Sequence, residues 1–208
     1  QIQLIDRNPY HTMLTELHEV AANRTSEDAV KMDLKKIFAG LKVEVVLDEV
    51  ENIDFNARSL QGQRASYAYD YLVIGTGSKP TFFGIPGAQE NSYTLWSYDD
   101  AVKLKERFRQ MFTEASKETD KTIRREKLSF VVVGAGFTGV ELIGEMAEYR
   151  KELCREFFID ESEVRMVVAD MAPKILPLLP DKLIAKAEKR LKKMDIEIIV
   201  GKQITGVS

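Results

Sequence analysis

The chain has 208 residues, of which 44% are hydrophobic, and a formal net charge of −3 at pH 7. This length fits one large or two small domains, and the hydrophobic fraction is sufficient for a packed core. The nearly balanced charge gives no sign of nucleic-acid binding, no apolar run approaches the ~18 residues of a membrane span, and no signal peptide is visible. The single cysteine, Cys154, excludes an internal disulfide framework and a Cys-x-x-Cys redox pair. Its polar helical context favours an incidental cysteine over a reactive one, and the sequence holds no cluster of metal ligands.

Both ends of the chain read as strands. Residues 2–6 begin a strand directly after Gln1, which no methionine precedes. Residues 196–208 read as a strand that runs to the end of the sequence. We therefore interpret the chain as a piece of a longer protein.

The first 78 residues predict an α/β unit. Residues 2–6 read Ile-Gln-Leu-Ile-Asp, a strand that ends in the acid Asp6. Apolar residues at helical spacing follow, and the unit closes on an apolar run that leads into Gly75, Thr76 and Gly77. The predicted elements are a strand over 2–6, a helix or loop over 8–23, a helix over 26–38, a strand over 43–47, an antiparallel meander over 50–69 and a strand over 71–74.

Residues 79–96 read as an irregular linker, because prolines and glycines recur between residues 80 and 87. Ser97 with Asp100 three residues later forms a capping-box pattern, which predicts the start of a helix. The apolar face of this helix runs to residue 115. The charged stretch 119–127 reads as a solvated loop rather than a binding patch.

The motif that organises the chain lies at residues 129–141, Ser-Phe-Val-Val-Val-Gly-Ala-Gly-Phe-Thr-Gly-Val-Glu. A short β-branched strand meets Gly134, Gly136 and Gly139 in Gly-x-Gly-x-x-Gly spacing, and a helical pattern follows at once. The first glycine allows a tight turn, the second lets the backbone approach phosphates, and the third lets helix and strand pack closely. The start of the helix then faces the pyrophosphate of a dinucleotide. A purely structural glycine turn is the alternative.

A second strand, residues 164–169, ends in Asp170. An acid at this position accepts hydrogen bonds from adenosine ribose hydroxyls. Its charge repels a 2′-phosphate, so we expect NADH to bind in preference to NADPH. The separation from Gly139 exceeds the usual ~20 residues, because residues 148–163 lengthen the helix and the loop after it. A plain acid at a strand end is the alternative.

Residues 171–208 continue the alternation of strands and helices. Prolines between residues 173 and 180 forbid a regular helix and predict an ordered loop beside the cofactor. Residues 181–194 predict an amphipathic helix whose six basic residues we interpret as solvated surface rather than a contact with anionic lipid. A strand over 196–200 extends the sheet.

A weak internal repeat gives the predicted fold class, which is α/β with two Rossmann-like dinucleotide-binding domains. The first domain lacks its first strand and the second lacks its last strands. The predicted division is a partial FAD-binding domain over 1–78, a linker over 79–96 and a partial NADH-binding domain over 97–208. Two such domains in tandem favour a flavin in one and a nicotinamide in the other.

Three motifs resemble the flavoprotein oxidoreductases that carry two dinucleotide folds, the pyridine nucleotide-disulfide oxidoreductase superfamily. They are Asp-Tyr-Leu-Val-Ile-Gly-Thr-Gly-Ser-Lys-Pro at 70–80, Gly-Ile-Pro-Gly at 84–87 and the glycine motif with its helix at 131–142. The continuation Gly-Val-Glu-Leu-Ile-Gly-Glu, with Ile-Asp-Arg-Asn-Pro-Tyr-His and Leu-His-Glu-Val-Ala-Ala near the start, is most similar to the type II NADH dehydrogenases. These are single-chain NADH:quinone oxidoreductases, and the resemblance covers nearly the whole chain.

The resemblance implies FAD and NADH as cofactors and a site for each. For FAD it implies contacts from the end of the first strand and from the glycine segment that closes the first domain. For NADH it implies contacts from the glycine motif and the acid after the second strand. The implied residues are Asp6, Arg7, Gly75, Thr76 and Gly77 for FAD, and Gly134, Gly136, Phe137, Thr138, Gly139 and Asp170 for NADH.

Glu141 stands where the branch carries a carboxylate close to the nicotinamide and the flavin, which implies a catalytic role. It could order the nicotinamide or relay a proton toward quinone. The alternative is a first-turn helix acid that the helix dipole favours. His11 and His18 are the only histidines, and structural packing is at least as good an explanation for His11 as chemistry.

Absences narrow the activity that the resemblance implies. Disulfide reductases of this superfamily carry paired cysteines beside the flavin and related peroxidases carry one, whereas residues 1–78 hold none. Hydride transfer from NADH to FAD and on to a membrane quinone is therefore the leading hypothesis. An NADH-dependent ferredoxin- or rubredoxin-type reductase and a non-catalytic NAD(H)-binding module are the alternatives.

The chain also departs from the branch pattern. The glycine-rich loop that would hold FAD is expected before Gln1, and the quinone-side segment and amphipathic membrane-binding tail are expected after Ser208. Ile143 stands where a small residue usually lets helix and sheet approach. We therefore expect the chain alone to bind NADH but to be inactive, the full-length protein to lie on the cytoplasmic face of the membrane, and exposed sheet edges to permit a homodimer.

Overall fold

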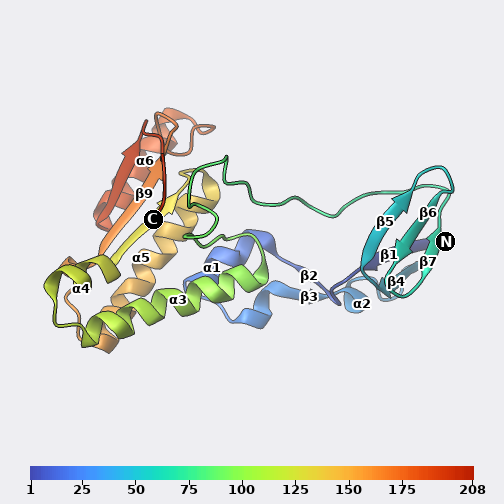
Figure 1. Cartoon of the computed structure of the whole chain (residues 1–208), viewed down its shortest axis with the longest axis horizontal. Helices are drawn as coiled ribbons and strands as arrows, with labels where there is room; N and C mark the ends of the chain where they lie inside the picture. Colours follow the sequence, from blue (N-terminus) through green and yellow to red (C-terminus); the bar gives the residue numbers. More distant parts are fainter. The chain divides into compact units, whose positions relative to one another are not determined.

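All 208 residues are described by the computed structural model, and their contacts divide the chain into two units (Figure 1). Unit 1 comprises residues 1–13 and 28–79, and unit 2 comprises residues 14–27 and 80–208. The predicted division keeps residues 14–27 with residues 1–78. They belong to unit 2 instead, because Leu17, Val20 and Ala21 are fully buried and their helix packs on two helices of that unit.

Unit 1 is built on a parallel strand pair. β1 (Ile2–Asp6) lies beside β4 (Val43–Leu47), with Ile2 opposite Val43 and Asp6 opposite Leu47. An antiparallel ribbon of β2 (Tyr10–Thr12) and β3 (Lys31–Asp33) follows, and β3 leads into the short helix α2 (Leu34–Ile37). Asp33 begins α2 by accepting a 2.8 Å hydrogen bond from the backbone N–H of Lys36.

A three-stranded antiparallel sheet completes unit 1, as the alternating pattern predicts. Its strands are β5 (Val50–Asp54), β6 (Ser59–Gly62) and β7 (Ser66–Ala68), in that order. Asp48 closes one end of this sheet and is only 4% exposed. Its carboxylate accepts hydrogen bonds from the Tyr67 hydroxyl at 2.7 Å and from the backbone N–H groups of Glu49, Arg64 and Ala65.

Tyr67→Phe is expected to destabilise this sheet in a pH-dependent way. The Tyr67 hydroxyl and the surrounding N–H groups hold the pKa of Asp48 below its ordinary value. The ionised carboxylate therefore contributes stability above a pH of about 4, and this contribution is lost as the pH falls through the lowered folded pKa. Hydrogen exchange of the β5–β7 amides should be faster in the variant at pH 7, and the difference should shrink toward pH 3. Tyr71→Phe, at a side chain that is 95% exposed, should change nothing.

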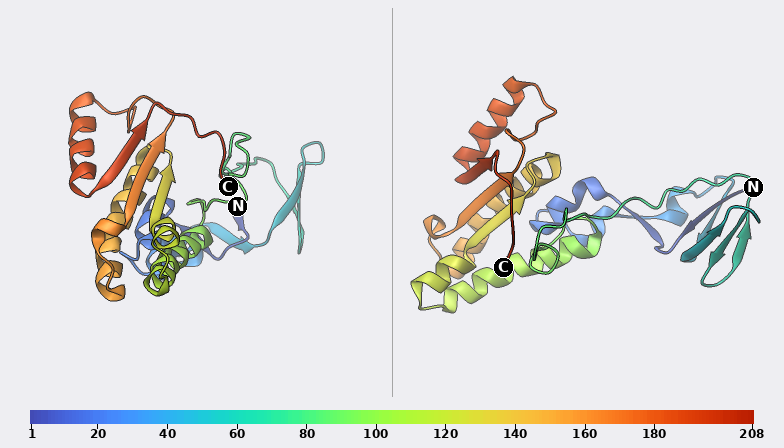
Figure 2. Two further views of the ribbon diagram at one scale, coloured as in Figure 1. Left: turned by 60° about the vertical axis from the view of Figure 1, so that its left-hand side comes forward. Right: turned by 45° about the horizontal axis from the view of Figure 1, so that its top comes forward.

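Unit 2 contains a three-stranded parallel sheet in the order β10-β9-β8 (Figure 2). The strands are β8 (Ser129–Val133), β9 (Arg165–Asp170) and β10 (Ile196–Val200). The connections are the long helix α5 (Phe137–Phe157) between β8 and β9, and the helix α6 (Asp181–Lys193) between β9 and β10. This repeated strand–helix–strand order, with all three strands parallel, is a Rossmann-like arrangement. The predicted mixed α/β fold with parallel sheets is therefore confirmed.

Two further helices of unit 2 pack on α5. Ser97 begins α3 (Tyr98–Lys117) with the predicted capping box: Ser97 Oγ accepts from the Asp100 N–H, and the Asp100 carboxylate accepts from the Ser97 N–H. α1 (Leu17–Ala21) packs on both α3 and α5, after a single 3₁₀ turn at Leu14–Glu16. Two further 3₁₀ turns lie at Glu27–Val30 and Glu161–Glu163.

Aromatic side chains bind α3 to the sheet. Phe108 of α3 meets Phe130 of β8 edge-on, with ring centroids 4.6 Å apart, and Phe112 stacks on the same ring at 5.8 Å. Phe108 also contacts Tyr149 of α5 at 5.9 Å. Each such pair adds about 0.5–1.5 kcal/mol to the effect of burial. The glycine motif between β8 and α5 is therefore held on a rigid frame.

Cys154 lies inside this frame, and we expect it to resist thiol reagents. It is 3% exposed on α5, and burial raises the pKa of its thiol to about 11. At pH 8 the folded protein then holds very little thiolate, which is the reactive form. Labelling with a soluble disulfide reagent should be slow in buffer and fast in denaturant. Rapid labelling of the folded chain would contradict this burial.

Three local predictions were wrong. Residues 71–74 form no strand, because no strand of the chain pairs with them and Tyr71 and Val73 stay more than nine-tenths exposed. Residues 121–127 form a helix, α4 (Lys121–Lys127), because Asp120 caps it through the N–H groups of Thr122 and Ile123. The helix predicted over 26–38 is interrupted by β3, which pairs with β2 inside the stretch 8–23 that was predicted as helix or loop.

Candidate functional site

The glycine motif forms a tight turn between β8 and α5. The backbone N–H of Gly134 donates a 2.8 Å hydrogen bond to the Ala169 carbonyl, which continues the ladder between β8 and β9. Gly134 has φ = +106°, in the region that side chains rarely adopt. Gly136 then precedes α5 with an extended backbone and without a capping side chain. The turn therefore depends on its first glycine for its backbone conformation.

The space beside the first two glycines of the motif differs from the space beside the third. A Cβ atom on Gly139 would lie 1.8 Å from the Gly134 carbonyl oxygen, so the first turn of α5 is packed directly on the glycine turn. A Cβ atom on Gly134 or Gly136 would meet nothing within 4 Å. The first two glycines thus leave open space beside the backbone, and the third brings helix and strand together.

The first turn of α5 offers free hydrogen-bond donors to this space. The helical hydrogen bonds begin with Val140 N–H donating to the Gly136 carbonyl, so the N–H groups of residues 137–139 have no partner inside the helix. Phe137 is 52% exposed, and Thr138 is also exposed. Free N–H groups, the positive end of the helix dipole and the absence of nearby side chains together suit a phosphate group.

Asp170 lies at the end of β9, next to the glycine turn. Its Oδ2 atom accepts a 2.6 Å hydrogen bond from the Ala135 N–H inside the turn, and its Oδ1 atom accepts a 2.8 Å bond from the Ala172 N–H. These two bonds to backbone groups were not foreseen from the sequence, which predicts a ribose contact for Asp170 with a plain strand-end acid as the alternative. A carboxylate has about four acceptor positions, so Asp170 can hold the turn and still accept bonds from a ribose.

Residues 171–180 form the predicted irregular loop beside the glycine turn. The Leu176 N–H donates a 2.8 Å hydrogen bond to the Ala135 carbonyl, while Ile175 is fully buried beneath the loop. Met171 and Leu178 remain 75% and 87% exposed. The loop is thus attached to the turn by a backbone hydrogen bond, and it exposes two apolar side chains.

Glu141 lies at the start of the second turn of α5, not in the first turn as the sequence alternative has it, and faces His18 of α1. The distance from His18 Nδ1 to Glu141 Oε2 is 4.0 Å, and the Glu141 side chain is 51% exposed. Their pairing has no signal in the sequence, because it arises from the packing of α1 against α5.

The residues predicted for the flavin lie in unit 1, where Asp6 repeats the local geometry of Asp170. Asp6 Oδ1 accepts a 2.8 Å hydrogen bond from the N–H two residues later, at Asn8, as Asp170 does from Ala172. Arg7 forms an exposed 3.5 Å ion pair with Glu49. Gly75, Thr76 and Gly77 lie in exposed irregular backbone, and no hydrogen bond or ion pair joins them to Asp6.

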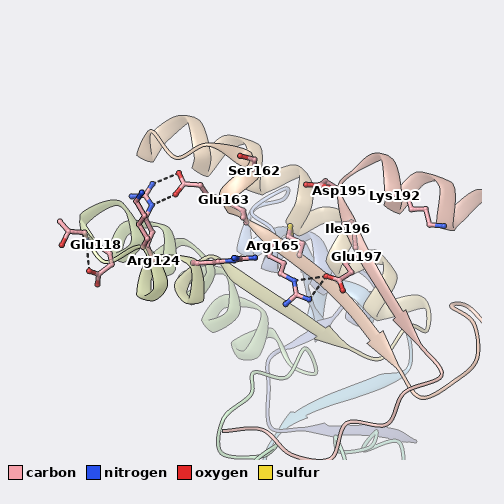
Figure 3. A pocket seen from close by; sticks show the side chains of 14 residues that line it. Glu118, Arg124, Ser162, Glu163, Arg165, Lys192, Asp195, Ile196 and Glu197 are labelled. Carbon is pink, nitrogen blue, oxygen red and sulfur yellow. Dashed lines mark hydrogen bonds and ion pairs between the residues drawn. The ribbon is translucent and has the colours of Figure 1, made fainter.

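A hollow of about 850 Å³ opens at the other end of the unit 2 sheet (Figure 3). Two ion pairs stand in its wall, Arg124 with Glu163 and Arg165 with Glu197, each closest at 2.7 Å. β9 spans six residues, about 16 Å, so this hollow is far from the glycine turn. Ligands of open parallel sheets bind at the carboxyl ends of the strands, which favours the glycine turn. The lining residues are Glu118, Thr119, Lys121, Arg124, Arg125, Ser162, Glu163, Val164, Arg165, Met166, Lys192, Asp195, Ile196 and Glu197.

Two other kinds of feature are absent from the structure. No group of three or more His, Cys, Asp and Glu side chains could hold a metal ion. No helix combines the length and the apolar character needed to cross a membrane.

Sequence comparison places this geometry among known proteins. The sequence profile described as pyridine nucleotide-disulphide oxidoreductase matches residues 2–208. The type II NADH:quinone oxidoreductase of Staphylococcus epidermidis is 34% identical over 206 residues, which are 98% of this chain and 50% of that protein. The chain thus spans about half the length of the curated relatives that it matches.

Structure comparison agrees on the fold. The structure of NDH2 from Plasmodium falciparum in complex with NADH matches with a TM-score of 0.92 at 19% identity, over 100% of this chain and 44% of that one. NADH:rubredoxin oxidoreductase from Clostridium acetobutylicum matches with a TM-score of 0.65 at 19% identity, over 98% of this chain and 47% of that one.

Proposed function

Because the chain belongs to the pyridine nucleotide-disulphide oxidoreductase family, we propose that it forms the NADH-binding part, and a portion of the FAD-binding part, of an NADH:quinone oxidoreductase. The observation that supports this most strongly is the glycine turn, in which open space, free N–H groups and the Asp170 carboxylate meet at the end of a parallel sheet. The names of the curated relatives favour quinone as the acceptor.

NADH fits the residues around the glycine turn. The open space beside Gly134 and Gly136 admits the pyrophosphate to the backbone, where the N–H groups of Phe137, Thr138 and Gly139 can donate to it. Asp170 would accept from the adenosine ribose with the acceptor positions that the backbone bonds leave free. The negative charge of Asp170 disfavours the 2′-phosphate of NADPH, so NADH is the expected substrate.

Unit 1 partly repeats the pattern seen around Asp170, and this repeat supports a flavin site there. Asp6 ends the first strand of a parallel pair and forms the same turn as Asp170, which suits the adenosine ribose of FAD. Arg7, Gly75, Thr76 and Gly77 are the further proposed contacts. Bound flavin would supply the redox chemistry, accepting the hydride of NADH and passing two electrons to an acceptor.

The chain contributes to this reaction by positioning NADH and by placing charged groups around it. The glycine turn fixes the pyrophosphate, and the rigid frame of α3, α5 and the sheet fixes the turn. Glu141 presents a half-exposed carboxylate from the second turn of α5, where it can orient the nicotinamide or relay a proton toward quinone. We propose that the full-length protein meets its quinone at the cytoplasmic face of a membrane and can form a homodimer.

Purified full-length protein tests this proposal. Flavin-dependent oxidation of NADH with a soluble quinone as acceptor is the expected result, with NADPH a poor substrate. Reduction of rubredoxin or ferredoxin in place of quinone would support the alternative reductase. Binding of NADH without flavin-dependent turnover would identify a non-catalytic NAD(H)-binding module and would contradict the enzyme.

A further inference from the structure

His18 is the only basic side chain in ion-pair contact with Glu141. Its Nδ1 atom lies 4.0 Å from Glu141 Oε2. This distance is too long for a direct hydrogen bond, so the contact is electrostatic or bridged by one water. His18 belongs to α1, whereas Glu141 lies two residues after Gly139, at the start of the second turn of α5.

Packing holds the imidazole in this place. The neighbouring residues Leu17, Val20 and Ala21 are almost completely buried where α1 meets α3 and α5 (Figure 1). Arg24, just after α1, forms a hydrogen-bonded ion pair with Glu145. Glu145 lies four residues after Glu141 and therefore on the same face of α5. α1 is thus fixed to α5 at two successive turns of one helix face.

The two side chains differ in exposure. The His18 side chain is 14% exposed and the Glu141 side chain is 51% exposed. The imidazole is therefore immobilised by its surroundings, while the carboxylate keeps half of its surface free for another group. A histidine held by packing beside a partly free carboxylate restricts the orientations of the carboxylate, as the groups that contact metal ligands do for those ligands.

We propose that His18 is a positioning residue for Glu141, which it orients toward the nicotinamide end of bound NADH. This inference rests on the proposed function, because it needs NADH at the glycine turn. It assigns His18 no contact with the substrate and no part in the transfer of hydride. Its effect passes through Glu141 alone, which makes it testable by a double-mutant cycle.

Binding to the 208-residue chain is the first readout. His18→Gln should weaken NADH binding about threefold and alter the fluorescence of the bound nicotinamide, because the Glu141 carboxylate becomes less ordered. The affinity for ADP-ribose, which lacks the nicotinamide, should stay unchanged. In the Glu141→Gln background, His18→Gln should have no further effect on NADH. Equal losses in both backgrounds, or equal losses for NADH and ADP-ribose, would show a purely structural role and overturn the proposal.

The full-length flavoprotein gives the second readout. His18→Gln should slow the reduction of bound flavin by NADH about tenfold, and again only when Glu141 is present. His11→Gln, at an exposed histidine of β2, is the matched control and should leave both readouts unchanged. If His18→Gln does not fold, His18→Asn is measured in its place. Failure of the wild-type chain to bind NADH would refute the proposed function, whereas normal binding with independent effects of the two variants would refute only the role of His18.

Discussion

Gly139→Ala is expected to destabilise unit 2 by about 3 kcal/mol or more and to abolish NADH binding. The added methyl group would lie 1.8 Å from the Gly134 carbonyl oxygen, and both atoms belong to backbone that cannot move independently. The helix must therefore withdraw from the turn, which displaces the free N–H groups of its first turn. Chemical denaturation and NADH titration of the variant measure the two effects.

Gly144→Ala is the matched control for this change. Gly144 lies in the same helix, but a Cβ atom there would meet nothing within 4 Å. Alanine is the better helix former, so this variant should be more stable by about 0.5–1 kcal/mol and should bind NADH normally. Similar stability of the two variants would show that the close packing of Gly139 on the turn is not required.

Asp170→Asn is expected to weaken both the turn and its affinity for NADH. The carboxylate accepts from two backbone N–H groups, at Ala135 and Ala172, and an amide can accept from only one of them. The other N–H then faces an NH₂ group and loses its partner, which costs about 1–3 kcal/mol. Because Ala135 lies inside the turn, NADH affinity should fall about tenfold or more. Thermal unfolding and NADH titration provide the measurements.

Asp195→Asn controls for the loss of one negative charge. Asp195 is exposed at the end of α6 and lines the hollow at the opposite end of the sheet. This variant should match the wild type in stability and NADH affinity. If both variants changed stability and NADH affinity by the same small amount, Asp170 would be an ordinary acid at a strand end.

The sequence predicts those elements that a local residue pattern marks. Ser97 with Asp100 marks the start of α3, and the glycine spacing marks the turn between β8 and α5, because both patterns are local requirements of backbone geometry. The parallel pairing of β1 with β4 and of β9 with β10 follows from apolar strands that alternate with helical segments.

The features that sequence patterns do not predict depend on contacts between segments that are distant in the chain. Residues 71–74 are apolar enough for a strand, but a strand also needs a neighbour, and β1 and β4 pair only with each other. His18 reaches Glu141 because α1 packs in unit 2, a contact between segments far apart in the chain. The hydrogen bonds that the Asp170 carboxylate accepts from the N–H groups of Ala135 and Ala172 depend on the final shape of the turn, which no spacing rule describes.

We propose that the glycine turn and Asp170 together hold the adenosine half of NADH. The decisive measurement is calorimetric titration of the 208-residue chain with NADH and, separately, with NADPH. We expect saturable binding of one NADH per chain, with NADPH at least about tenfold weaker because the Asp170 carboxylate repels the 2′-phosphate. Equal or tighter binding of NADPH, or no binding of NADH to a chain that circular dichroism shows to be folded, would contradict it.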